Sequence, residues 1–218
     1  MLEIYLDTAN FEALEKGYKT GIIKGITTNP TILKQENRPR FESLQQLALL
    51  EPEIVFIQVV GDSFEERKED FYRIYKFCEE QHINFGPKVP IDMVGLELIS
   101  YIINNYPDIK ILGTAIYSSD QGIIAALAGC HYLAPYYNRM LNESIDAQNE
   151  IAKMRDFFDE HQLETKILCA SFKNSAQVFE AIDAGAHAVT VGMDVYESMV
   201  NKRLAKLAIE VFNQDGKE

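Results

Sequence analysis

Phe85-Gly-Pro-Lys-Val-Pro90 is an apolar, β-like segment that holds one charged side chain, Lys88, between two prolines. A lysine on a buried apolar strand loses hydration, and this loss disfavours the charged ammonium form. The neutral amine is the nucleophile of Schiff-base chemistry. An edge-strand lysine that faces water would have the same local sequence, so the rest of the chain must decide between the two interpretations.

Similar short apolar runs recur along the chain and are separated by helical patterns. The predicted strands cover residues 2–6, 22–26, 54–60, 85–90, 109–112, 131–134, 166–170 and 188–191. The predicted helices cover residues 10–19, the stretch from 30 to 50, 63–81, 93–106, 119–128, 143–160, 175–184 and a final stretch to about 213. Eight β/α units therefore fill the chain.

The strands are continuous apolar runs without polar alternation, which is typical of a parallel sheet covered by helices. Eight such units predict an α/β protein of the closed (β/α)8 TIM barrel type, formed by residues 1–218 as one domain. An open doubly wound sheet is the alternative. No Gly-x-Gly-x-x-Gly motif follows the first strand, and this argues against a dinucleotide-binding sheet.

Composition narrows the possible partners and the cellular location. Of 218 residues, 47% are hydrophobic, yet the longest apolar runs, such as 123–128, are far too short to span a membrane. The first residues lack the pattern of a signal peptide, so we expect a cytoplasmic protein. Lys and Arg number 21 against 33 Asp and Glu, and the net charge of −12 argues against nucleic-acid binding.

The cysteines and histidines do not form a metal-binding pattern. The three cysteines are scattered without CxxC spacing, which is typical of reduced, buried thiols in the cytosol: Cys78, Cys130 and Cys169. The four histidines also lack metal-ligand spacing: His82, His131, His161 and His187. We therefore expect no metal and no cofactor.

Polar side chains follow the predicted strands at the end where a (β/α)8 barrel carries its active site. They come from seven different β/α units: Asp7, Thr27 with Asn29, Gln58, Lys88, Thr114, Tyr136 with Arg139, and Ser171 with Lys173. The eighth strand offers only Gly192, which leaves room for a ligand. Together they combine a nucleophile, a carboxylate, amides, hydroxyls and cations. Such a set suits a substrate with a carbonyl, several hydroxyls and a phosphate.

Most members of this set have a simpler explanation when taken alone. Asp7 could cap the first helix, and residues 27–30 have good turn chemistry. The aromatic and cationic side chains after the later strands could be rim packing and surface charge. Gln58 is harder to explain in this way, because an amide that faces inward from an apolar strand needs a hydrogen-bond partner.

A series of short motifs runs in order through nearly the whole chain: Tyr5-Leu-Asp-Thr8, Gly25-Ile-Thr-Thr-Asn-Pro30, Lys88-Val-Pro90, Gly113-Thr-Ala-Ile-Tyr117, Ala126-Leu-Ala-Gly129, Ala134-Pro-Tyr136 with Asn138-Arg139, and Ala170-Ser-Phe-Lys173. In these motifs the chain resembles the transaldolase family, and within it the short fructose-6-phosphate aldolase-like branch. The resemblance implies a metal-independent class I aldolase barrel with an extra C-terminal helix that reaches a neighbour. It also implies ring-like homo-oligomers, as pentamers or decamers.

The resemblance implies roles for the residues at the strand ends. Lys88 is similar to the imine-forming lysine, while Asp7, Thr27 and Asn29 match groups that bind and orient the donor's hydroxyls. Phosphate-holding positions in related enzymes match Arg139 and Ser171, and Lys173 is a further substrate-binding cation. The implied partners are sugar phosphates and dihydroxyacetone. Fructose 6-phosphate would be cleaved to dihydroxyacetone and glyceraldehyde 3-phosphate, or formed in the reverse aldol addition.

A water used for proton transfer separates the two branches of the family. True transaldolases hold it with a glutamate on strand three and have a phenylalanine on strand six. This chain has Gln58 and Tyr136 there, as in the aldolase branch, and Thr114 matches the third water-holding group. The alternatives are transaldolase activity, in which the enamine passes to a second aldose phosphate, and a non-catalytic sugar-phosphate binding barrel.

The chain departs from the family pattern beside the lysine. Gly86-Pro87 stands where branched apolar residues are usual, and Asp92 stands where a threonine is common. We expect the chain to differ from its relatives at these positions.

Overall fold

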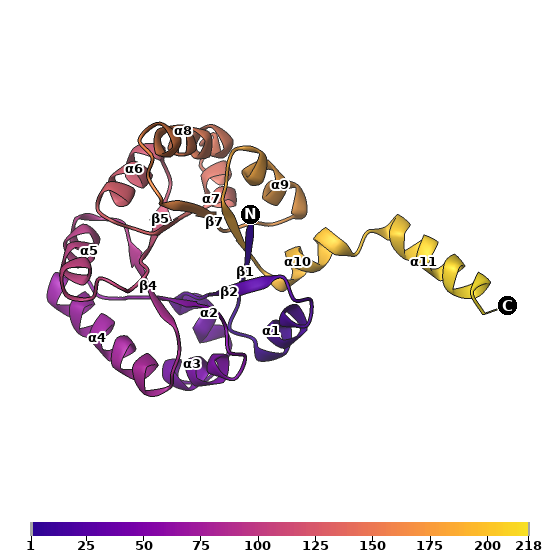
Figure 1. Cartoon of the computed structure of the whole chain (residues 1–218), viewed down its shortest axis with the longest axis horizontal. Coiled ribbons are helices and arrows are strands. Elements are labelled where there is room, and N and C mark those ends of the chain that lie inside the picture. The colour runs from indigo at the N-terminus through magenta and orange to yellow at the C-terminus, as the bar shows by residue number, and fades with distance from the viewer. Residues whose placement is uncertain (1, 218) are drawn as a thin grey trace.

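The computed structural model describes residues 2–217. Its eight strands pair in chain order as a closed parallel barrel, and the helices form an outer ring around it (Figure 1). The strands are β1 (Glu3–Asp7), β2 (Ile23–Thr27), β3 (Val55–Gln58), β4 (Phe85–Pro90), β5 (Leu112–Ile116), β6 (Tyr132–Pro135), β7 (Lys166–Cys169) and β8 (Ala188–Val191). The predicted (β/α)8 TIM barrel is confirmed, and the open sheet is wrong.

The helices follow the predicted order but are divided more finely. They are α1 (Phe11–Tyr18), α2 (Pro30–Gln35), α3 (Arg40–Ala48), α4 (Phe64–Glu80), α5 (Met93–Asn105), α6 (Ser119–Leu127), α7 (Tyr137–Asn142), α8 (Ala147–Glu160), α9 (Ser175–Asp183), α10 (Met193–Val200) and α11 (Arg203–Asp215). Two predicted helical stretches, 30–50 and the one after β8, are each two helices. Pro39 at the α3 N-cap divides the first stretch, because a proline has no N–H for the preceding turn.

Two predictions near the functional end of the barrel are wrong in their boundaries. No helix was predicted between residues 134 and 143, but α7 occupies this segment and carries Arg139. The fifth strand begins at Leu112, because Ile109 is still in a turn whose amide donates to the Tyr106 carbonyl. Thr114 therefore lies within β5, paired in register with Pro90, and not after the strand as predicted.

Large aromatic rings fill the middle of the barrel. Tyr5, Phe56 and Tyr132 pack with ring centroids 5.2–6.2 Å apart. Burying a side chain of this size stabilises the fold by about 1.5–3 kcal/mol. Gly86 makes space for this packing, since a Cβ there would lie 2.5 Å from the Phe56 ring and 2.8 Å from the Lys110 carbonyl oxygen. The unusual glycine two residues before Lys88 is thus explained by the barrel core.

Side-chain caps fix the helices that start at the carboxyl ends of the strands. Asn29 accepts from the Ile32 amide at α2, and Asp92 accepts from the Gly95 amide at α5. Ser63 and Glu66 form a capping box at the start of α4. Each such cap is typically worth about 1 kcal/mol. The caps hold the loops that surround this end of the barrel.

The predicted extra C-terminal helix is present as α11, which extends away from the barrel (Figure 1). No residue of α11 is buried within the chain, although the helix is amphipathic. Among residues 2–217, no helix is long and apolar enough to cross a membrane.

Candidate active site

Side chains alternate between the two faces of each strand, and this alternation points most of the predicted polar residues into the interior of the barrel. Side chains of Tyr5, Phe56 and Leu112 form part of the inner core, so the residues two positions further along also face inward. At the carboxyl ends of the strands, which we call the C-terminal mouth, these inward positions are Asp7, Thr27, Gln58, Lys88, Thr114, Tyr136 and Thr190.

A cavity of about 510 Å³ opens at the C-terminal mouth. Of the predicted site residues, those in its wall are Asp7, Asn29, Lys88, Tyr136, Arg139, Ser171 and Lys173. Thr27, Gln58 and Thr114 are not part of the wall. Residues from the loops after β7 and β8 complete the wall, as is usual for phosphate sites in this fold.

Lys88 is the central residue of the cavity. It is 2% exposed, and its Nζ donates to the Thr28 carbonyl at 3.2 Å. No carboxylate of residues 2–217 lies within 4.0 Å of this nitrogen. The amine is therefore held in place by one carbonyl oxygen and is not occupied by an ion pair. This arrangement leaves the nitrogen available to react with a ligand in the cavity.

A chain of hydroxyl groups orients Asp7. Thr27 donates to Asp7 Oδ1 at 2.7 Å, and Thr190 Oγ1 lies 2.7 Å from Thr27 Oγ1. A hydroxyl has a single proton, so Thr190 must be the donor to Thr27. Both threonines are fully buried. The predicted donor-binding Thr27 thus directs its proton to the carboxylate and not to the cavity.

Thr190 is one of the residues that the sequence analysis missed. It is an isolated hydroxyl in the apolar strand Ala-Val-Thr-Val, which is the same kind of signal as the isolated amide of Gln58. The eighth strand therefore contributes more than the space beside Gly192. Thr28 was also missed, but its contribution is a backbone carbonyl, which no side-chain pattern can reveal.

Thr114 and Tyr136 form a second hydroxyl pair, with their oxygens 2.9 Å apart. Gln58 lies on the other side of Lys88, as its register partner on the neighbouring strand β3. The Tyr136 ring packs edge-on against Tyr117 at 5.7 Å between centroids. This contact fixes the ring plane that presents the phenol to Thr114.

Cations gather on the side of the cavity formed by α7 and the loop after β7. The guanidinium carbon of Arg139 lies 4.8 Å from the Tyr136 ring centroid, and its Nη1 lies 3.5 Å from the Tyr117 hydroxyl. This hydrogen bond raises the pKa of Arg139 further, so the group stays charged. Ser171 has a φ of 64°, a left-handed conformation that turns the chain toward the cavity together with Lys173.

Asn29 is divided between two tasks. Its Oδ1 caps α2 by accepting the Ile32 amide at 3.0 Å, and its side chain also lines the cavity. With the oxygen committed to the helix, the two N–H donors remain for a ligand hydroxyl or carbonyl.

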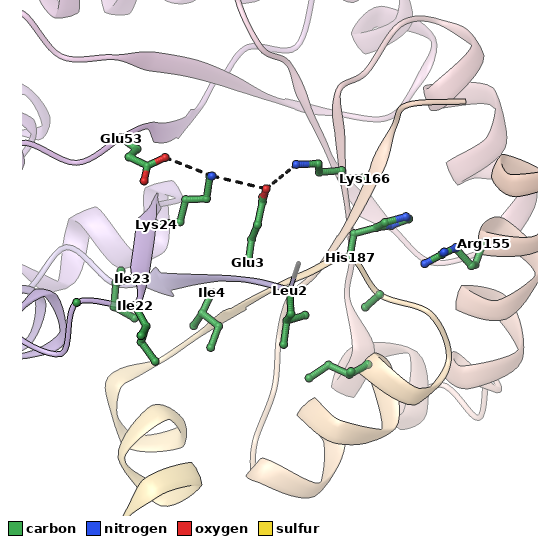
Figure 2. A pocket seen from close by; sticks show the side chains of 13 residues that line it. Leu2, Glu3, Ile4, Ile22, Ile23, Lys24, Glu53, Arg155, Lys166 and His187 are labelled. Carbon is green, nitrogen blue, oxygen red and sulfur yellow. Dashed lines mark hydrogen bonds and ion pairs between the residues drawn. The ribbon is translucent and has the colours of Figure 1, made fainter. Parts of the chain in front are cut away.

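The opposite, N-terminal mouth of the barrel has a larger cavity of about 890 Å³ but different chemistry (Figure 2). There Glu3 is paired with Lys166 and lies 3.7 Å from Lys24, which in turn lies 3.3 Å from Glu53. Its charged groups thus satisfy one another. Within residues 2–217, no group of three His, Cys, Asp or Glu side chains is placed to hold a metal ion.

The fold and the C-terminal mouth define a (β/α)8 barrel with a buried lysine, an oriented carboxylate and cations around one cavity. The family model for transaldolase/fructose-6-phosphate aldolase matches residues 4–217. A probable fructose-6-phosphate aldolase of Streptococcus pneumoniae is 37% identical over 98% of this chain and 96% of its own length. The chain belongs to the transaldolase/fructose-6-phosphate aldolase family.

Solved structures agree on the fold. A thiamine phosphate pyrophosphorylase from Pyrococcus furiosus is similar, with a TM-score of 0.58 and 14% identity over 87% of this chain and 85% of the other. At this identity the similarity concerns the barrel architecture alone.

Proposed function

We propose that the protein is a class I aldolase that cleaves fructose 6-phosphate to dihydroxyacetone and glyceraldehyde 3-phosphate and catalyses the reverse addition. One observation carries the proposal: Lys88 is 2% exposed, has no ion-pair partner among residues 2–217, and lines a cavity with Asp7 and Arg139. Family membership and the fructose-6-phosphate aldolase name of the relative support the same activity.

In the first half of the reaction, Lys88 Nζ attacks the C2 ketone, and loss of water gives an iminium. Asp7 accepts the proton of the C4 hydroxyl while the C3–C4 bond breaks, and the bonding pair moves into the iminium. Glyceraldehyde 3-phosphate then leaves. The Asn29 amide would bind donor hydroxyls, and Arg139, Ser171 and Lys173 would bind the phosphate, since all four line the cavity.

In the second half, the enamine of dihydroxyacetone takes a proton at C3 from a water held by Gln58, Thr114 and Tyr136. Hydrolysis of the iminium then frees Lys88 and dihydroxyacetone. The 2.9 Å contact between Thr114 and Tyr136 supports this role. General acid–base catalysis of this kind is typically worth about 10² to 10⁴ in rate.

Trapping the imine tests the central step. The protein is incubated with dihydroxyacetone and borohydride, and the adduct is mapped by mass spectrometry. We expect one adduct, on Lys88, and none in a Lys88→Met control. An unmodified Lys88, or an adduct on Lys173 in its place, would contradict the covalent mechanism.

Transaldolase activity is the second candidate, favoured by the shared family. Gln58 and Tyr136 argue for the aldolase, because a neutral amide and a phenol replace the glutamate and phenylalanine of transaldolases. Release of free dihydroxyacetone from fructose 6-phosphate is measured without an acceptor. Turnover that appears only when erythrose 4-phosphate is added would establish the transaldolase instead.

We further propose that residues 1–218 form one catalytic domain that assembles into a ring-like homo-oligomer, a pentamer or decamer, through α11. Four of its exposed apolar side chains share one helical face: Leu204, Leu207, Val211 and Phe212. Light scattering of the whole protein should give a pentamer or a multiple of it. Leu207→Glu should shift the protein toward monomers, and an unchanged mass would contradict a role for α11.

A cytoplasmic location completes the proposal. Three free, buried cysteines support it, because thiols of this kind are typical of a reducing compartment. Burial raises the pKa of the Cys78 and Cys130 thiols to about 12. The net charge of −12 supports the absence of a nucleic-acid partner.

A further inference from the structure

An arginine–aspartate pair holds the chain where it leaves β3, directly after Gln58. Arg40 of α3 donates from Nη2 to the Gln58 carbonyl at 2.6 Å and from Nη1 to both carboxylate oxygens of Asp70 at 2.8 and 3.1 Å. Asp70 of α4 also accepts the Val60 amide at 3.0 Å. The pair therefore binds the backbone on both sides of Val59.

This pair lies outside the cavity but is not an ordinary surface ion pair. Asp70 is 8% exposed, and neither Arg40 nor Asp70 belongs to the cavity wall. Charge-assisted hydrogen bonds in a buried place are stronger and more directional than those between neutral groups. The pair is thus suited to fix the backbone at Gln58.

A second pair secures the same loop to the loop after Lys88. Arg67 donates from Nε to the Gly61 carbonyl at 2.9 Å and from its two terminal nitrogens to Asp92 at 2.6 and 2.7 Å. Asp92 also caps α5 through the Gly95 amide. The hydrogen bond from Arg67 lowers the pKa of Asp92, which keeps the cap charged. The unusual Asp92 is thereby explained as a link between the β3 and β4 loops.

We propose that Arg40 and Asp70 are positioning residues that set the place of Gln58 beside Lys88 and so control proton transfer to and from the substrate carbon. The inference rests on the proposed aldolase function, in which Gln58 helps to hold the reacting water. Gln58 and Lys88 are register partners on adjacent strands, so a shift at the end of β3 changes their relative position directly. Imine formation at Lys88 does not need this water.

Exchange of a carbon-bound hydrogen of dihydroxyacetone for deuterium from D₂O measures proton transfer separately from cleavage of the C3–C4 bond. Lys88 and dihydroxyacetone lose one water and form the iminium. The held water then takes a proton from the carbon beside C2, the C–H pair becomes the C=C bond, and the C=N pair moves to nitrogen. A deuteron from D₂O restores the C–D bond by the reverse path, and hydrolysis releases labelled dihydroxyacetone.

The test variants are Arg40→Lys and Asp70→Asn. A lysine keeps the positive charge but cannot donate to Asp70 and to the Gln58 carbonyl as a planar fork does. An asparagine can still accept the Val60 amide but has no charge to hold Arg40. Deuterium incorporation, measured by NMR, should fall by about 10- to 100-fold, a range typical of a misplaced catalytic group. The yield of borohydride-trapped imine at Lys88 should stay at the wild-type level.

Arg155→Lys provides the matched control. Arg155 makes the same kinds of contact at the other mouth, from Nε to Asp159 at 2.8 Å and from Nη1 to the Gly185 carbonyl at 3.2 Å. We expect unchanged exchange in this variant. Thermal unfolding of every variant is measured beside the activity. If Asp70→Asn does not fold, Arg40→Lys carries the test, because it preserves the charge pair.

The outcomes separate the two proposals. Wild-type exchange rates in a folded Arg40→Lys protein would overturn the positioning role and leave the aldolase intact. Imine yield and exchange that fall together would show a general disturbance of the site and also overturn it. A wild-type protein that forms no adduct on Lys88 would instead refute the proposed function, and the positioning role with it.

Discussion

The two mouths of the barrel contain similar side chains in opposite states. At the N-terminal mouth, Glu3 Oε2 accepts from the hydroxyls of Tyr5 and Tyr132 at 3.0 and 3.2 Å. Lys166 and Lys24 balance the charge of Glu3 (Figure 2). At the C-terminal mouth, Lys88 has one carbonyl partner and no carboxylate within 4.0 Å among residues 2–217. The charged groups of the N-terminal mouth are therefore paired with one another, whereas Lys88 at the C-terminal mouth can still bind a ligand.

Cavity size alone would point to the wrong end. The N-terminal cavity, at about 890 Å³, exceeds the C-terminal one, at about 510 Å³. Polar groups that satisfy one another stabilise the fold, whereas groups held in place but left with spare bonding capacity can act on a substrate. The difference therefore predicts that substitutions at the C-terminal mouth change activity and those at the N-terminal mouth change stability.

Lys88→Met is the strongest test of this contrast. Removing the proposed nucleophile should lower fructose 6-phosphate cleavage by roughly 10⁴-fold or more, a range typical of nucleophile removal. Stability should be unchanged or higher, because an apolar side chain replaces a buried polar one. Steady-state kinetics and thermal unfolding measure the two effects. A marked loss of stability would mean that Lys88 is a structural residue.

Tyr136→Phe should have the next largest effect. It removes the hydroxyl that lies 2.9 Å from Thr114 and keeps the ring that packs on Tyr117. We expect kcat to fall by about 10²-fold, the lower range of general acid–base catalysis. Rapid-quench trapping should find imine formation preserved. If KM rose and kcat did not change, Tyr136 would instead be a binding residue.

Glu3→Gln at the N-terminal mouth should have the opposite effect to Lys88→Met: stability should fall and activity should be nearly unchanged. The side chain of Glu3 is 10% exposed, but its lysine partners are 42% and 37% exposed, so solvent screens part of the attraction. We expect a loss of about 1–2 kcal/mol of unfolding free energy, between the values for surface and buried pairs. Activity at 25 °C should stay within about twofold. A large fall in kcat with unchanged stability would refute a purely structural role.

The pH dependence of stability tests the role of Glu3 at the N-terminal mouth further. Burial alone would raise the pKa of Glu3, but hydrogen bonds from Lys166 and Tyr5, together with the lysine charges, lower it below the ordinary 4.5. A lowered carboxyl pKa adds stability that is fully present above pH 4.5 and is lost as pH falls through the folded-state value. Urea unfolding from pH 7 to pH 3 should therefore show wild type and Glu3→Gln converging. A gap that widens at low pH would contradict the assignment.

Much of the barrel was predictable because its signals are local. Apolar runs such as β4 and β8 have the same boundaries in the structure as in the sequence analysis. The start of β5 at Leu112 was not predicted, because a glycine such as Gly113 directly after an apolar run is typical of the end of a strand. In the barrel Gly113 lies inside β5, where a Cβ would approach Ile91, Cys130 and Leu133 at 3.0–3.2 Å.

The candidate site was predictable in its members but not in its connections. Lys88, Asp7 and Arg139 could be selected because polar residues that follow apolar strands collect at one mouth. Their catalytic roles remain predictions. The donation from Thr190 through Thr27 to Asp7 joins residues 163 and 20 positions apart in the chain, so no local pattern encodes it.

The sequence by itself determined the order of eight strands, the lysine in Phe85-Gly-Pro-Lys-Val-Pro90 and the polar residues that meet around it. These follow from side-chain period and burial, which short stretches of chain express. Only the tertiary structure decided that Gly86 makes room for Phe56, that Asp92 binds Arg67, and that Arg40 holds the end of β3. Such contacts depend on closure of the barrel, which brings distant segments within hydrogen-bond distance.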